Sequence, residues 1–174
     1  MIVDRESSHF IFVVPRRHFH GLYNYINYRG KDLTNHEYLD HWGKWIVFGP
    51  AEELAELAKK IDPYVEENKI PAAKYDREKI NEFKLGECVM CIYCDERQRE
   101  DVWQILSSLG VDEKMWVFER ETLERWMPGG HLLERWISGK RLSLEQAERV
   151  RDGAREKFKK MFEDPNAVFK GIDQ

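Results

Sequence analysis

All three cysteines of the chain fall within one short segment, 88–94, at the spacing C-x-x-C-x-x-C. Thiolates at this spacing could hold an iron–sulfur cluster, but the further Cys and the Pro of a ferredoxin-type run are absent, so another ligand would have to complete the site. The four spacers are Val, Met, Ile and Tyr, which are typical of a strand. In a strand, Cys88 and Cys94 share one face and Cys91 points to the other. The pattern therefore favours a buried strand over a metal site.

Basic residues form a second set that could do chemistry. Phosphate binding requires convergent Arg and Lys side chains, since a guanidinium pairs two phosphate oxygens at once. Arg16 and Arg17 directly follow an apolar run, Lys44 lies within another, and Lys74 follows a proline. We expect these four residues to hold the phosphate of a ligand. The alternative is that each is an ordinary surface charge, in a chain with 28 Lys and Arg.

Aromatic residues could cover the ring of such a ligand, because every base has a face that an aromatic side chain can stack on. Trp45, Trp103 and Trp116 lie inside apolar patterns and are expected in the core. Trp42 and Trp126 lie at the ends of predicted elements. These two are therefore the predicted ring-covering residues.

An enzyme that eliminates phosphate would need a general base and a group that protonates the leaving oxygen. His18 and Lys44 are the candidate bases, although no spacing selects a pair. His18 and His20 could bind a metal if their segment is extended, but a polar loop is the favoured interpretation. No P-loop, dinucleotide fingerprint, serine elbow or H-E-x-x-H motif is present, and we expect neither a metal nor a cofactor.

Composition describes a globular chain of 174 residues, 42% of them hydrophobic. This length predicts one domain over residues 1–163, followed by a flexible tail over 164–174. A net charge of -4 gives no bulk attraction to nucleic acid, although local basic patches could still bind it. The odd number of cysteines, the lack of an apolar run long enough to span a bilayer and the lack of a signal-peptide pattern predict a cytoplasmic protein without a membrane partner. The 34% charged residues suggest a thermophilic source.

Apolar patterns predict the elements that must position these residues. Strands are expected at 9–14, 43–48, 87–94 and 114–118, and helices at 50–62, 96–109, 119–126 and from 144 onward. Pro63 is expected to break or restart its helix, while Asp95 and Ser143 are expected helix caps. The order of elements predicts an α+β fold, with a curved, mainly antiparallel sheet and helices packed on one face.

Several short stretches resemble one family, namely Gly43–Phe48, Ala73-Lys74, Cys91–Asp95, Glu100–Val102 and Leu109-Gly110. It is the uncharacterised family of the basophilic-leukaemia-expressed protein, which carries a phosphothreonine lyase label. The resemblance covers roughly residues 33–130, about the scale of a domain. It implies a fold like that of the messenger-cap-binding translation initiation factors, with basic groups at Lys44, Lys74 and Lys114.

The sequence therefore predicts a module that binds a phosphorylated small molecule or a nucleotide on the concave face of the sheet. The alternatives are a phosphothreonine-lyase-like enzyme that uses the same pocket, a scaffold that binds another protein through an exposed aromatic patch, and the less favoured metal or iron–sulfur protein.

Overall fold

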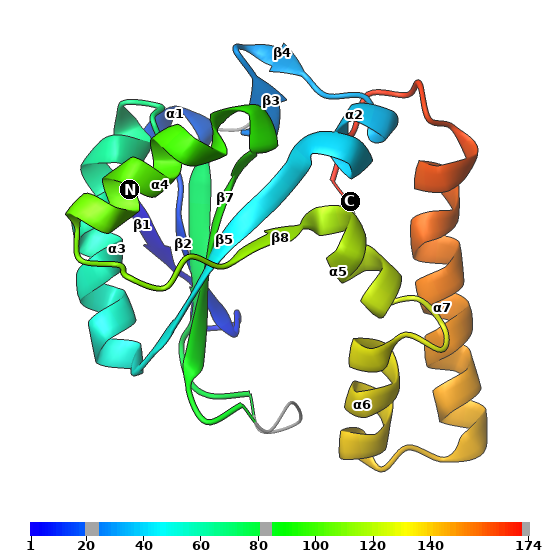
Figure 1. Ribbon diagram of the computed structural model, residues 1–174. Coiled ribbons are helices and arrows are strands. Elements are labelled where there is room, and N and C mark those ends of the chain that lie inside the picture. Colours follow the sequence, from blue (N-terminus) through cyan, green and yellow to red (C-terminus); the bar gives the residue numbers. More distant parts are fainter. Residues whose placement is uncertain (20–24, 81–84, 172–174) are drawn as a thin grey trace.

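The computed structural model of the protein describes residues 1–19 (without the side chains of His18 and Phe19), 25–80 and 85–171. A six-stranded sheet with the order β1-β2-β6-β7-β5-β8 forms its centre, and neighbouring strands run antiparallel (Figure 1). Its strands are β1 (Ile2–Asp4), β2 (Phe10–Val13), β5 (Trp42–Gly49), β6 (Ala72–Asp76), β7 (Cys88–Asp95) and β8 (Trp116–Phe118). A separate small hairpin pairs β3 (Asn27–Tyr28) with β4 (Lys31–Asp32).

Helices make up the rest of the α+β architecture, which confirms the predicted fold class. They are α1 (Arg16–Phe19), α2 (Asn35–His41), α3 (Ala51–Glu66), the short 3-10 helix η2 (Glu96–Gln98), α4 (Arg99–Ser108), α5 (Glu119–Arg125), α6 (His131–Lys140) and α7 (Leu144–Glu163). As expected, α3 and α4 pack on one face of the sheet. Figure 1 shows α5, α6 and α7 on the other side, beyond edge strand β8.

The chain from β5 to β8 consists of two interleaved units. In β5-α3-β6 and in β7-α4-β8, a helix connects two parallel strands that have one antiparallel strand between them. This is the split βαβ arrangement, in which each unit inserts a strand into the other. The β1-β2 hairpin then extends the sheet at β6. As a result, β5, β6 and β7 lie side by side although α3 separates β5 from β6 in the sequence.

Helix α3 shows why a proline signal can mislead. The apolar residues Leu54, Leu57, Ala58, Ile61 and Val65 recur at helical spacing and are buried against the sheet. Pro63 lies inside the helix, which continues to Glu66, so the expectation that Pro63 breaks it is wrong. Proline removes one hydrogen bond near the end of the helix, and burial of Val65 beyond it holds the last turn in place.

The main core lies between the sheet and the helices α3 and α4. Met90, Ile92 and Cys94 from β7 meet Val102 and Leu106 from α4, and all five side chains are fully buried. The cysteine segment is therefore a core strand, as predicted from its apolar spacers.

A second core forms where the C-terminal segment returns to α2. The ring of Phe169 stacks on Tyr38 with the centroids 3.8 Å apart, and the backbone N–H of Asn35 donates to the Ala167 carbonyl. Within the predicted tail, Phe169 is thus anchored in the second core, whereas most of the other residues of 164–171 are exposed. Phe169 supplies a large apolar ring that the sequence pattern left unassigned. Within the described ranges, no helix combines the length and the apolar character needed to cross a bilayer.

Candidate functional site on the lysine-bearing face of the sheet

Sheet register brings two of the predicted phosphate-binding residues together. Lys44 of β5 lies opposite Tyr93 of β7, and Lys74 of β6 lies opposite Cys91 of the same strand. Because side chains alternate along a strand, these four point to one face, which is opposite the face covered by α3 and α4. The two ammonium groups lie 5.7 and 5.9 Å from the centroid of the Tyr93 ring. We call Lys44, Lys74, Cys91, Tyr93 and Phe10 the lysine face.

Lys44 is held in a nearly buried ion pair. Its Nζ lies 2.5 Å from Oε1 of Glu119, the first residue of α5, and the two side chains are only 9% and 10% exposed. An unpaired charge at such a position would be strongly unfavourable, whereas a close partner offsets the loss of hydration. The pair therefore ties β5 to the helix that follows β8.

Lys74 has a different environment. Its Nζ lies 4.1 Å from the centroid of the Phe10 ring, and the side chain is half-buried. Among the residues that the structure describes, no carboxylate comes within ion-pair distance of Lys74. Aromatic rings attract a cation, but more weakly than a carboxylate does. Lys74 is thus the lysine of this face that lacks a carboxylate at ion-pair distance in the described ranges, whereas Lys44 has Glu119.

Cys91 lies between the two lysines. Burial raises the pKa of its thiol, and the positive charges of Lys44 and Lys74 offset part of that rise in pKa. Burial likewise holds the pKa of Tyr93 well above its ordinary value. At neutral pH both groups are therefore protonated and neutral, and the charge of the lysine face comes from its lysines.

One further titratable pair borders this face. Asp76 at the end of β6 accepts a hydrogen bond from the backbone N–H of Val89 and lies 3.4 Å from the ring of His9. Burial raises the pKa of Asp76, while these two contacts act in the opposite direction. Its carboxylate is thus engaged with Val89 and His9. The charge of Lys74 also lowers the pKa of Asp76, although the two side chains are not within ion-pair distance in the described ranges.

The two arginines do not join the lysines. The Arg16 guanidinium lies 3.9 Å from Glu66 in the last turn of α3 and is 79% exposed, and Arg17 contacts Asn68 just beyond that helix. Helix α3 covers the opposite face of the sheet, so the predicted four-residue phosphate cluster is corrected to Lys44 and Lys74. The sequence showed that the arginines follow the strand β2, but it did not indicate toward which face of the sheet their side chains would extend.

The predicted ring-covering tryptophans also pack elsewhere. Trp42 is 1% exposed and stacks on Tyr38 in the second core, so its ring has no face open to a ligand. Trp126 ends α5 and is half-buried between the second core and the small core of α6 and α7. Lys114 pairs with Glu100 near Trp45 and Trp103, away from the lysine face.

The candidate base His18 belongs to α1, but its side chain lies outside the described part of the structure, as does all of His20. Lys44, the other candidate base, is the residue that is ion-paired with Glu119. In residues 1–17, 25–80 and 85–171, no group of three or more His, Cys, Asp or Glu side chains is placed to hold a metal ion.

Three residues of the site were missed by reasoning from the sequence. Tyr93 could have been found, because it lies two residues after Cys91 in the same strand and therefore on the same face. Phe10 and Glu119 could not, because β2 meets β6, and α5 meets β5, only through contacts between segments far apart in the chain.

No family model, no curated protein and no solved structure matches this chain. The family resemblance is thus without support from these comparisons, and a function is inferred from the site alone.

Proposed function

We propose that the lysine face binds a small phosphorylated ligand, such as a nucleotide, with Lys74 as the main phosphate contact. The observation that carries the proposal is the half-buried Lys74 ammonium, which lies near two aromatic rings and has no carboxylate at ion-pair distance in the described part of the chain. An anion placed there would supply the missing partner. Charge-assisted hydrogen bonds of this kind are about twice as strong as neutral ones.

The same surroundings could hold the rest of a nucleotide. Phe10 and Phe12 of β2 are adjacent, half-buried rings on this face, with centroids 6.4 Å apart. Base–aromatic stacking contributes about 1–3 kcal/mol per base. Phe10 and Phe12 thus replace Trp42 in the proposed ring-covering role.

Simple binding accounts for this site better than elimination of phosphate does. A lyase needs a group that is free to accept a proton next to the substrate. Lys44 already has Glu119 at 2.5 Å, and the Cys91 thiol is made less acidic by burial. The proposed role of both lysines is therefore electrostatic.

Titration with inorganic phosphate, a nucleoside monophosphate and a nucleoside triphosphate at low salt tests the proposal. A ligand that binds only the folded protein raises the thermal midpoint as its concentration increases. We expect Lys74→Met to weaken binding at least tenfold, since hydrogen bonds to charged groups contribute about 1.5–3 kcal/mol. Equal binding by Lys74→Met and the unmodified protein would overturn the proposal.

Lys69→Met is the matched control. Lys69 also lies over a tyrosine ring, 5.8 Å from the centroid of Tyr64, but it is exposed on the outside of the molecule and pairs with Glu67. Its replacement removes the same charge and leaves the lysine face unchanged. Binding should therefore stay within about twofold of the unmodified protein, since surface ion pairs contribute little.

A further inference from the structure

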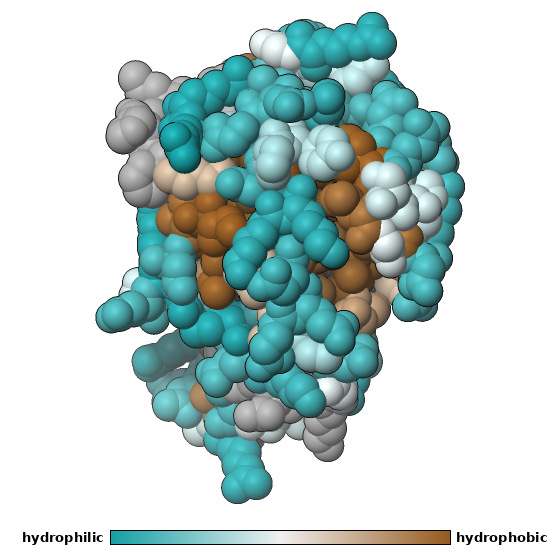
Figure 2. All heavy atoms as spheres, turned by 90° about the vertical axis from the view of Figure 1, so that its left-hand side faces the viewer, coloured by the Kyte–Doolittle hydropathy of each residue, from teal (hydrophilic) through white to brown (hydrophobic). Residues whose placement is uncertain are grey.

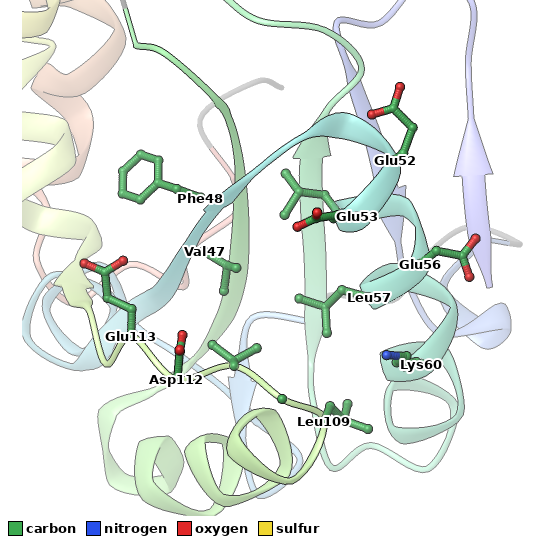
Figure 3. A pocket seen from close by; sticks show the side chains of 13 residues that line it. Val47, Phe48, Glu52, Glu53, Glu56, Leu57, Lys60, Leu109, Asp112 and Glu113 are labelled. Carbon is green, nitrogen blue, oxygen red and sulfur yellow. The ribbon is translucent and has the colours of Figure 1, made fainter.

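A groove with a volume of about 500 Å³ lies on the other side of the molecule, between α3 and the segment 109–113 that connects α4 to β8 (Figure 3). Val47, Leu57 and Val111 give it an apolar lining. Its volume is within the range of about 300–1,000 Å³ that is typical of ligand pockets. Figure 2 shows apolar surface framed by hydrophilic side chains on the side of the molecule that carries α3 and α4.

The rim of this groove is strongly acidic. The residues that line it include a single basic one, Lys60. They also include five carboxylates, Glu52, Glu53, Glu56, Asp112 and Glu113. Glu56 pairs with Lys59 at 2.6 Å. The other four carboxylates have no ion-pair partner in the described ranges. A cationic occupant is therefore favoured, and phosphate-rich occupants such as nucleic acid or an anionic membrane are repelled.

One border of the groove is an open edge of the sheet. Strand β8 pairs with β5 only over Gly43–Trp45. Next to these pairs, the Ile46 N–H donates to the carbonyl of Met115, the residue before β8, at 2.9 Å. Beyond that point, residues 47–49 pair with β7 on one side, and no described strand pairs with them on the other. Unpaired strand edges are templates for the addition of another chain.

Side chains at this edge suit an added strand. Figure 3 shows Val47 and Leu57 pointing into the groove, and Phe48 pointing away from it. Phe48 is 36% exposed, a large value for a ring in a strand. An extended segment alongside residues 47–49 would thus meet an apolar surface on both of its faces and carboxylates around it.

We propose that this acidic groove binds a basic segment of a partner protein, which adds to the open edge of β5 in an extended conformation. Backbone hydrogen bonds to the edge would align the segment, as in other cases of strand addition. An apolar side chain would enter the groove beside Val47 and Leu57, and flanking Lys or Arg side chains would pair with the rim. This site is separate from the lysine face, so the proposal of peptide binding does not depend on whether the lysine face binds phosphate.

The probe is a synthetic peptide of sequence KLKVRLK, with KSKSRSK as the apolar-deficient control and ELEVELE as the charge-reversed one. We expect saturable one-to-one binding of KLKVRLK that weakens with salt, and no binding of the other two. Amide hydrogen exchange of Phe48 should slow in the complex, because its N–H points to the same side as that of Ile46, which donates to Met115, whereas Val47 and Gly49 face β7. Equal binding of KLKVRLK and KSKSRSK, or binding without slower exchange at Phe48, would overturn the proposal.

Matched variants separate the groove from general charge attraction. The double variant Glu52→Lys with Asp112→Lys reverses two rim charges, and the control Glu156→Lys with Asp164→Lys reverses two exposed carboxylates in and at the end of α7. The two variants carry the same net charge. We expect the first to bind the peptide about tenfold more weakly than the second, because each reversal replaces attraction by repulsion at the rim. Equal affinities would show that only the overall charge acts, and would refute the site.

Discussion

The two faces of β7 use one cysteine-containing segment in opposite ways. Toward α3 and α4 it presents Met90, Ile92 and Cys94, all fully buried among apolar side chains. Toward the other side it presents Cys91 and Tyr93, which lie among lysine side chains. The same strand, with residues of similar apolar character on both faces, is therefore half core and half candidate site.

This difference shows what decides the environment of a strand residue. Alternation assigns each residue to a face, but the elements packed over that face decide whether it is dry and apolar or charged. Two helices seal one face of β7, whereas lysines from β5 and β6 flank its other face. Substitutions on the two faces should therefore have different consequences.

The largest effect is expected from Met90→Ala on the helix side. Removing a fully buried Met leaves a cavity, and such changes destabilise proteins by about 2–5 kcal/mol. Cys91→Ala on the lysine face should cost less than about 1 kcal/mol, since it removes only one small, partly exposed group. Urea unfolding of both variants measures the two values, and similar losses would contradict the comparison of the faces.

A loss of about 1–3 kcal/mol is expected from Glu119→Ala, because it leaves the nearly buried Lys44 ammonium without its partner. Adding Lys44→Met to Glu119→Ala should recover much of this stability, since the unpaired charge is then removed. Glu124→Ala in the same helix is the control, because its pair with Arg120 is exposed and should change stability by less than about 1 kcal/mol. A Glu119→Ala variant as stable as the Glu124→Ala variant would show that the buried pair has no net role.

Thiol reactivity should sharpen the contrast within the segment. In the folded protein Cys91 should be alkylated before Cys94, which is fully buried and whose pKa is raised far above its ordinary value by burial and by Asp95. The thiolate is the reacting form, and burial raises the pKa of Cys91 above its ordinary value. Its alkylation rate should therefore keep increasing as pH passes through that value.

Lys74→Met should slow alkylation of Cys91 at a given pH, because loss of a nearby cation raises the pKa of the thiol further. Mass spectrometry of partly alkylated protein gives the order, and the urea-unfolded chain is the reference in which all three thiols react alike. Preferential alkylation of Cys94 in the folded state would contradict the assignment of faces.

The smallest effect is expected from Arg16→Ala. Its exposed contact with Glu66 at 3.9 Å predicts a change in stability of less than about 0.5 kcal/mol. Because Arg16 contacts the end of α3 and not the lysine face, phosphate binding should stay unchanged in the same titrations that reveal the effect of Lys74→Met. Loss of phosphate binding in Arg16→Ala would show that Arg16 contributes to the phosphate site after all.

Several elements could be predicted because their signals are local. The apolar run of β7, and the capping box of Ser143 and Gln146 that starts α7, both have the expected geometry. Asp95 does cap a helix, but that helix is the short η2 and α4 follows only at Arg99.

Helix α6 was not predicted, although Leu133 and Ile137 are spaced for one buried face. The glycines before it indicate a turn, and they obscured the start of a helix immediately after Gly130. In the structure Gly130 approaches the Arg125 carbonyl so closely that a Cβ would lie 2.4 Å from its oxygen. A glycine is required there for packing, which is a reason that the local sequence does not display.

By itself the sequence determined which residues of each strand share a face, because side chains alternate with a period of two whatever the strand pairs with. It also determined the apolar side of α3, through helical spacing. Only the tertiary structure decided that Lys44 and Lys74 flank one tyrosine, that the arginines face α3 and that β5 ends in an open edge. These outcomes depend on strand order and register, which are set by contacts between residues far apart in the chain, and no local pattern carries that information.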